Sequence, residues 1–367
     1  MDIEKFDFDS DITNLTAGVK SGNIKIVPSL EWLGFLLIYE FLCRKGGVMF
    51  FVVVPVFMVI LLGYCFGKIK PDGGGSDKLI NDYVLYVALP ALLFLAVAQS
   101  DLADLQQWDF LWSTLLGIVS VYVIGGVVAR LAGIELPGSS ILSMGASYGT
   151  TGYMGVPILL SVYGSQAALP AAIATIIHNI PAIMAVIISW DVFGKKAGGE
   201  GVFPVQSALR ALRVTLTNPL TVSVLAGLAF VVFGINVPGF LDSFASFLGA
   251  AAGPTALFAL GLGLSRLDVK EHVNSKAIKV VVPMVVLKTA VQPIITFLVA
   301  VYFFGMGDGD ELWLAAAVVM AAQPIGAGVY VFAKKYGYKP DTISLAIIVS
   351  LLVSLVTIPV VLGLFGF

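Results

Sequence analysis

Charged side chains are scarce in this chain of 367 residues. They make up 12% of it, against about 25% in a typical soluble protein, whereas hydrophobic residues make up 58%. The 21 basic residues are scattered, so the clustered positive footprint of a nucleic-acid-binding protein is missing and nucleic acid is excluded as a partner. This composition predicts an integral membrane protein with many spans.

Cysteine and histidine are also nearly absent. Cys43 and Cys65 allow at most one disulfide, and His178 and His272 lie far apart in the sequence. Neither pair has the spacing of a metal site, so no metal and no cofactor are expected. The sequence shows no pairing of a nucleophile with a base, which argues against an enzyme.

Long apolar runs, in contrast, recur throughout the chain after residue 47. About 20 apolar residues are enough to cross a bilayer as a helix. The sequence predicts ten such spans, near residues 48–67, 79–99, 111–133, 139–162, 168–191, 218–235, 243–264, 278–304, 312–334 and 342–366. The expected fold is therefore an all-α integral membrane domain.

Lysine and arginine follow the odd-numbered spans only. The regions after spans 1, 3, 5, 7 and 9 carry all the basic residues of the predicted loops, and those after spans 2, 4, 6 and 8 carry none. Because basic loops stay in the cytoplasm, this alternation predicts a protein of the cytoplasmic membrane, bacterial in type, with both termini outside.

Ten spans with a basic linker after the fifth suggest two halves. We expect a first repeat at residues 47–193, a short cytoplasmic linker at 194–217 and a second repeat at 218–367. An odd number of spans in each half makes the second repeat inverted. Proline and phenylalanine recur at the same spacing in residues 89–95 of span 2 and 253–259 of span 7.

Spans 4 and 9 are both interrupted by glycine and proline. Residues 149–157 read GTTGYMGVP and residues 323–328 read QPIGAG. Glycine and proline disfavour continuous helix, and paired interruptions of two repeats point to a transporter's binding site. Close helix packing with a simple kink is the alternative.

If both helices break, the positive ends of their second halves suit an anion. We expect these ends around Gly155–Val156 and Ile325–Gly328. The predicted substrate site consists of Thr150, Thr151, Gly152, Tyr153, Gly155, Pro157, Gln323, Pro324, Gly326, Gly328 and Lys288.

Lys288 is expected near the middle of span 8, where an ionisable group is costly and usually functional. Apart from Asp82 and Asp191 near span ends, the predicted spans contain no carboxylate. Lys288 is therefore expected either to bind an anionic substrate or to brace the free carbonyl groups of a broken helix.

Other buried polar residues leave several roles open. His178 and Asn179 are candidates for proton coupling, although a hydrogen bond between helices would also explain the histidine. Gln292 and Gln323 could bind a carboxylate or each other. Asn218, followed by proline, is expected to cap the first turn of span 6.

Residues 1–46 differ from the rest, because their first part is acidic and polar and their second part is apolar but interrupted by glutamate. They lack the basic start of a signal peptide. An interfacial helix is one interpretation, and a translation start at Met49 is another.

Four stretches together resemble the auxin efflux carrier family, and within it the bacterial malonate-carrier-like members. They are residues 55–64 in span 1, 86–94 in span 2, 152–157 in span 4, and 218–220 with Gly227 in span 6. The resemblance implies two inverted five-helix repeats, crossed broken helices 4 and 9, and transport of small organic anions. The family often has asparagine where this chain has Thr150 and Thr151. This departure changes the hydrogen-bonding groups at the crossover, so the resemblance does not carry over the identity of the substrate.

The leading hypothesis is therefore a secondary active transporter that moves a malonate-like or other carboxylate by alternating access. A proton or a sodium ion is the candidate coupling ion, and a homodimer is an open alternative. The rival hypotheses are a cation-coupled carrier of a related fold and a membrane sensor or partner subunit that transports nothing.

Overall fold

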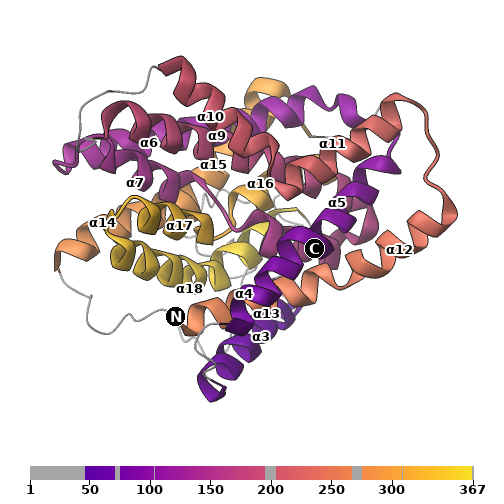
Figure 1. Cartoon of the computed structure of the whole chain (residues 1–367), viewed down its shortest axis with the longest axis horizontal. Helices are drawn as coiled ribbons and strands as arrows, with labels where there is room; N and C mark the ends of the chain where they lie inside the picture. Colours follow the sequence, from indigo (N-terminus) through magenta and orange to yellow (C-terminus); the bar gives the residue numbers. More distant parts are fainter. Residues whose placement is uncertain are drawn as a thin grey trace, which may run out of the picture. The chain divides into compact units, whose positions relative to one another are not determined.

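The computed structural model describes residues 46–70, 75–102, 104–194, 204–266, 275–307 and 309–365. The chain divides into two units, Met1–Gly47 and Val48–Phe367, and the second unit contains the helical fold. The expectations for residues 1–45 lie outside the described residues. Within the described ranges the fold is all-helical, and its only extended pairing is a single bridge (Figure 1).

Helix occupies each of the five ranges predicted as spans in the first half. The helices are α3 (Gly46–Ile69), α4 (Gly75–Tyr83) continuing into α5 (Leu89–Ala98), α6 (Trp108–Leu131), α7 (Gly138–Ser147) followed by α8 (Val156–Tyr163), and α9 (Ala168–Phe193).

The second half follows the same plan, with helix in each predicted range. Its helices are α11 (Pro219–Val232), α12 (Gly239–Ala250) followed by α13 (Ala252–Ser265), α14 (Ser275–Val286) continuing into α15 (Gln292–Leu298), α16 (Glu311–Ala321) followed by α17 (Ala327–Lys335), and α18 (Pro340–Leu364).

The linker between the halves contains a helix that the apolar runs do not reveal, α10 (Pro204–Leu216). It is bent by 72° from α11. At the bend the Asn218 side chain accepts a hydrogen bond of 3.0 Å from the Leu220 N–H, and Pro219 opens the helix. The predicted cap is confirmed.

Six helical segments are long and apolar enough to cross a membrane, or seven if the bent pair α10 and α11 counts as one. One of the six, Thr151–Phe193, has 43 residues. At about 1.5 Å per residue it would reach roughly twice the thickness of a hydrocarbon core of about 30 Å. Gly164, with a φ of 72°, turns the chain inside it. Ten crossings stay a prediction.

Three π-helical turns each end two residues before a proline. The turns Val84–Ala88, Thr151–Gly155 and Leu287–Val291 precede Pro90, Pro157 and Pro293. Proline cannot donate to the helical ladder, and a wider turn accommodates the missing bond. Two of these turns hold predicted site residues.

Two helix pairs show matching close contacts through glycine. A Cβ atom at Gly227 of α11 would lie 2.7 Å from the Phe94 carbonyl oxygen of α5, and one at Gly63 of α3 would collide with the Phe258 carbonyl oxygen of α13. The Phe94 ring packs edge-to-face on Phe230, with centroids 5.2 Å apart, and the Phe258 ring contacts Phe66 of α3 in a tilted arrangement, with centroids 5.6 Å apart.

Candidate functional site at the crossing of two broken helices

The breaks in the two interrupted helices lie side by side. We call the paired segments, residues 148–150 and 324–326, together with the helix starts that follow them, the crossing. Gly149, between α7 and α8, forms an antiparallel bridge with Ile325, between α16 and α17. The Thr150 N–H donates to the Pro324 carbonyl at 2.9 Å, and the Gly326 N–H donates to the Tyr148 carbonyl at 3.0 Å. Each unwound strand therefore satisfies the backbone of the other, as buried backbone requires.

Side chains hold this crossing together from both directions. The Thr150 hydroxyl donates to the carbonyl oxygen of Ile325 at 3.1 Å. The Ile325 N–H donates to the Ser350 hydroxyl of α18 at 3.0 Å. Ser350 is fully buried. It is a site residue that the sequence analysis missed, because one serine in an apolar span carries no distinctive signal.

The helix after the first break begins earlier than predicted. We expected its positive end at Gly155–Val156, but the Gly155 N–H already donates to the Thr150 carbonyl at 3.2 Å, and the helical turns start at Thr151. The amide groups of Thr151, Gly152 and Tyr153 thus form the free N-terminal end, and no acceptor for them lies among the described residues.

The second helix end lies close to its predicted place. Gly326 is the cap of α17, so the N–H groups of Ala327 and Gly328 are the first free donors. The Tyr148 ring covers this end, since a Cβ atom at Gly328 would lie 2.9 Å from its hydroxyl and one at Gly326 would meet ring carbons. Tyr148 is a second contact that sequence analysis missed.

Lys288 is fully buried beside the crossing. Its ammonium nitrogen donates to the Ala321 carbonyl at the end of α16 and would lie 3.1 Å from a Cβ atom at Gly149. This bond from Lys288 to a carbonyl of the broken helix is the structural brace that the sequence analysis gave as one of two possible roles. A cation there also offsets the negative end of the α16 dipole.

Gln323 and Gln292 are both fully buried, yet they do not bond to each other. The Gln323 amide nitrogen donates to the Val319 carbonyl at 2.9 Å, and its oxygen has no partner among the described residues. Neither the amide nitrogen nor the amide oxygen of Gln292 has a hydrogen-bond partner among these residues. Unpartnered buried polar atoms are rare, and they mark positions where a water or ligand can bind.

His178 is fully buried in the middle of α9. Its Nδ1 lies 2.9 Å from the Ala174 carbonyl one turn earlier, and within the described part of the chain Nε2 has no partner. The expected hydrogen bond between helices is therefore wrong for this histidine, because the bond stays within its own helix. Asn179 is also buried.

The remaining predicted residues pack against helices of both halves of the fold. A Cβ atom at Gly152 would lie 3.6–3.8 Å from Leu89, Thr175 and Leu220 side chains, and one at Gly253 would lie 3.6 Å from Pro157. The helix after the first break is thus in contact with α5, α9, α11 and α13.

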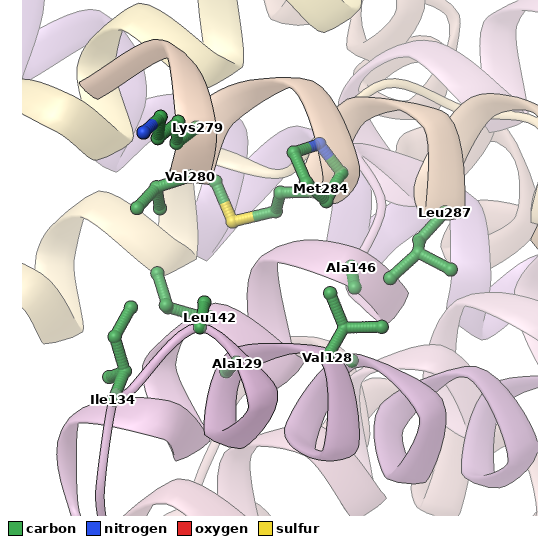
Figure 2. Close-up of a pocket in the computed structure, with 12 residues that line it drawn as sticks. Val128, Ala129, Ile134, Leu142, Ala146, Lys279, Val280, Met284 and Leu287 are labelled. Atoms are coloured by element: carbon green, nitrogen blue, oxygen red, sulfur yellow. The ribbon is translucent and has the colours of Figure 1, made fainter. Parts of the chain in front are cut away.

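Three cavities in the described part of the chain lie away from the crossing. One, between α14 and the pair α6 and α7, has a volume of only about 30 Å³. Figure 2 shows Met284 and Val280 facing Leu142 across it. Two hollows of about 430 and 420 Å³ lie at the ends of α5 and α11 and between α6 and α9.

Comparison with known proteins identifies the family. Residues 48–362 match the family described as "Membrane transport protein". A Rhizobium meliloti protein named "Putative malonate transporter" is 28% identical over 317 residues, which cover 83% of this chain and 92% of that protein. "Auxin efflux carrier component 5" of Arabidopsis thaliana is 23% identical, over 82% of this chain and 92% of its own length. The chain therefore belongs to the membrane transport family that includes the auxin efflux carriers, and it is an integral membrane protein.

Proposed function

We propose that this protein is a secondary active transporter that moves a small organic anion, such as malonate, across the cytoplasmic membrane. The observation that carries the proposal is the concentration at the crossing of hydrogen-bond donors that have no acceptor among the described residues. Free amide groups lead both helices, and Lys288 adds a positive charge when its amine is protonated. Helix N-termini with a nearby cation suit a carboxylate.

Alternating access follows from an arrangement in ten spans and two inverted repeats, with both termini outside. The glycine contacts support this arrangement. Spans 2 and 7 are equivalent in the proposed repeat, and so are spans 1 and 6. The contact of Gly227 with Phe94 joins spans 6 and 2, and that of Gly63 with Phe258 joins spans 1 and 7. The second contact is thus the repeat image of the first.

In this scheme the crossing forms the mobile part. Helices α6–α9 and α14–α18 would carry the anion past a scaffold built from α3–α5 and α11–α13. Residues 149–152 and 323–326 are buried, whereas Ala327 at the start of α17 is exposed. In this scheme an anion reaches the buried part of the crossing only when the helices move. The malonate named for the Rhizobium meliloti relative makes small dicarboxylates the first substrates to test.

The test is the apparent melting temperature of the detergent-purified protein with a panel of mono- and dicarboxylates and indole-3-acetate. Each is measured with and without sodium. A ligand of the folded state raises the melting temperature, by an amount that grows with its concentration relative to its Kd. We expect a selective shift with one small carboxylate.

Each other outcome has a defined meaning. No shift across the panel, in a protein that melts cooperatively, would contradict an anion carrier and favour the sensor hypothesis. A shift produced by sodium alone would favour the cation-coupled carrier. The negative control is Gly326→Ala, in which the new methyl group collides with the Tyr148 ring and distorts the crossing. This variant should show a smaller shift in melting temperature, or none, with the same carboxylate.

A further inference from the structure

Among the residues that the structure describes, none places a negative charge beside Lys288 to balance it. Its π-helical turn packs against α6, α7, α14, α15 and α18. The titratable groups nearest to it are Tyr148, which follows α7, and His178 on α9. The carboxylates of these helices stand in end turns, at Asp109, Asp191 and Asp341. The cations of these helices are Arg130 in the last turn of α6, and Lys276 and Lys279 in the first five residues of α14.

Asp191, the one of these carboxylates that is buried in a described helix, is already paired. Arg210 of α10 lies 3.2 Å from it. Within the described residues, the polar partner that the structure gives the Lys288 ammonium is the carbonyl of Ala321. A carbonyl can accept from a neutral amine as well as from an ammonium ion. The brace therefore does not require the charge.

A buried ammonium without a counter-charge has a large desolvation cost, and an adjacent carboxylate offsets it. The free energy of protonating Lys288 must then depend on whether the crossing holds an anion. Two binding events with such a mutual dependence are thermodynamically linked, and the linkage is reciprocal. An anion promotes protonation of Lys288, and protonation promotes binding of the anion.

We propose that Lys288 is the proton-binding site of the transport cycle, which rests on the proposed function. When a carboxylate binds at the crossing, the amine takes one proton from water on that side and forms a new N–H bond. When the carboxylate leaves on the other side, the ammonium releases that proton to water there. The anion and one proton therefore cross together.

This assignment differs from the expectation that His178 couples the proton. His178 would add a second positive charge beside Lys288, because the electrostatic influence of Lys288 reaches it. Two neighbouring cations in a buried site repel each other. The structure thus favours one protonation site at the lysine, with the histidine neutral.

The experiment is isothermal titration of malonate into the purified protein at pH 8, where small carboxylic acids are ionised, in two buffers with different ionisation enthalpies. The difference in binding heat gives the protons taken up. We expect about one proton for each malonate bound by wild type. In Lys288→Arg, whose guanidinium is always protonated, each malonate that binds should do so without proton uptake, whatever the change in affinity. His178→Gln should keep the uptake.

The outcomes separate the two proposals. Malonate binding by wild type without proton uptake overturns the role of Lys288 and leaves the anion carrier intact. Loss of uptake in His178→Gln with retained binding also overturns it, because the histidine is then the site. Absence of binding by malonate and by every acid of the panel overturns the carrier and this inference together. If Lys288→Arg fails to fold, the proton uptake measured for wild type and for His178→Gln still tests the role of Lys288.

Discussion

The crossing of the broken helices and the contacts between scaffold helices are both packed through glycine, but for different reasons. At Gly63 and Gly227 the missing side chain lets one helix rest on the backbone carbonyl of another. At Gly149, Gly326 and Gly328 it leaves room for polar or ring atoms of Lys288 and Tyr148. The first region is filled by apolar contacts, whereas the second keeps buried donors and acceptors unpartnered.

This difference separates stability from function. A helix contact with every polar group satisfied gains nothing from a ligand. A buried group without a partner is destabilising by about 1–3 kcal/mol, and a ligand that bonds to it removes that cost. Natural proteins retain such groups mainly where they are used. Substitutions in the two regions should therefore have different signatures.

The largest effect is expected at the crossing. In Gly326→Ala the new methyl group collides with the half-buried Tyr148 ring. Overpacking of this kind destabilises by about 1–3 kcal/mol, and it also shifts the N-terminal end of α17. We expect malonate uptake into proteoliposomes to fall at least tenfold.

Gly263→Ala is the matched control, because a Cβ atom at this glycine of α13 meets nothing within 4 Å. It should transport like wild type, with unchanged or slightly raised stability, since alanine favours helix. Equal uptake by the Gly326→Ala and Gly263→Ala proteins would show that the crossing tolerates disturbance and would remove the distinction between the regions.

The scaffold contacts should affect stability without abolishing ligand binding. Gly63→Ala and Gly227→Ala each press a methyl group onto a backbone carbonyl that cannot rotate away. We expect each to lower the stability by about 1–3 kcal/mol, measured as a lower melting temperature. The malonate-dependent shift should remain. Because the two glycines are equivalent in the proposed repeat, a loss confined to one of them would contradict that equivalence.

A smaller effect is expected from the hydroxyl group that supports the second break. Ser350→Ala leaves the Ile325 N–H without its acceptor, a cost of about 1–3 kcal/mol. The bond that the structure describes for Ser354 of the same helix goes to the Leu351 carbonyl one turn earlier. Ser354→Ala leaves no backbone N–H without its acceptor, so it should lower stability less than Ser350→Ala does. Equal melting temperatures for the two variants would rule out a structural role for the Ser350 contact.

Most of what the sequence predicted correctly came from two features, the length of the apolar runs and the positions of glycine and proline within them. Helix lies in all ten predicted ranges, and both interruptions are breaks. Long apolar runs must be helical inside a bilayer, so such a prediction depends on composition alone. The cap at Asn218 was predictable for a similar reason, since its hydrogen bond is local.

Contacts between distant segments were not predictable in the same way. The pairing of Gly149 with Ile325 joins residues of different halves, and Ser350 and Tyr148 gain their roles only from that pairing. The start of the helix at Thr151 was missed because a π-helical turn has no sequence pattern of its own. Helix α10 was missed because it is short and amphipathic.

The most direct test of the central claim is uptake of radiolabelled malonate into proteoliposomes by wild type and by Lys288→Met. The account predicts saturable uptake by wild type, and a loss of at least tenfold in a variant that remains folded by its melting curve and elution profile. Near-wild-type uptake by Lys288→Met would contradict the claim that the crossing binds the anion with the help of this lysine.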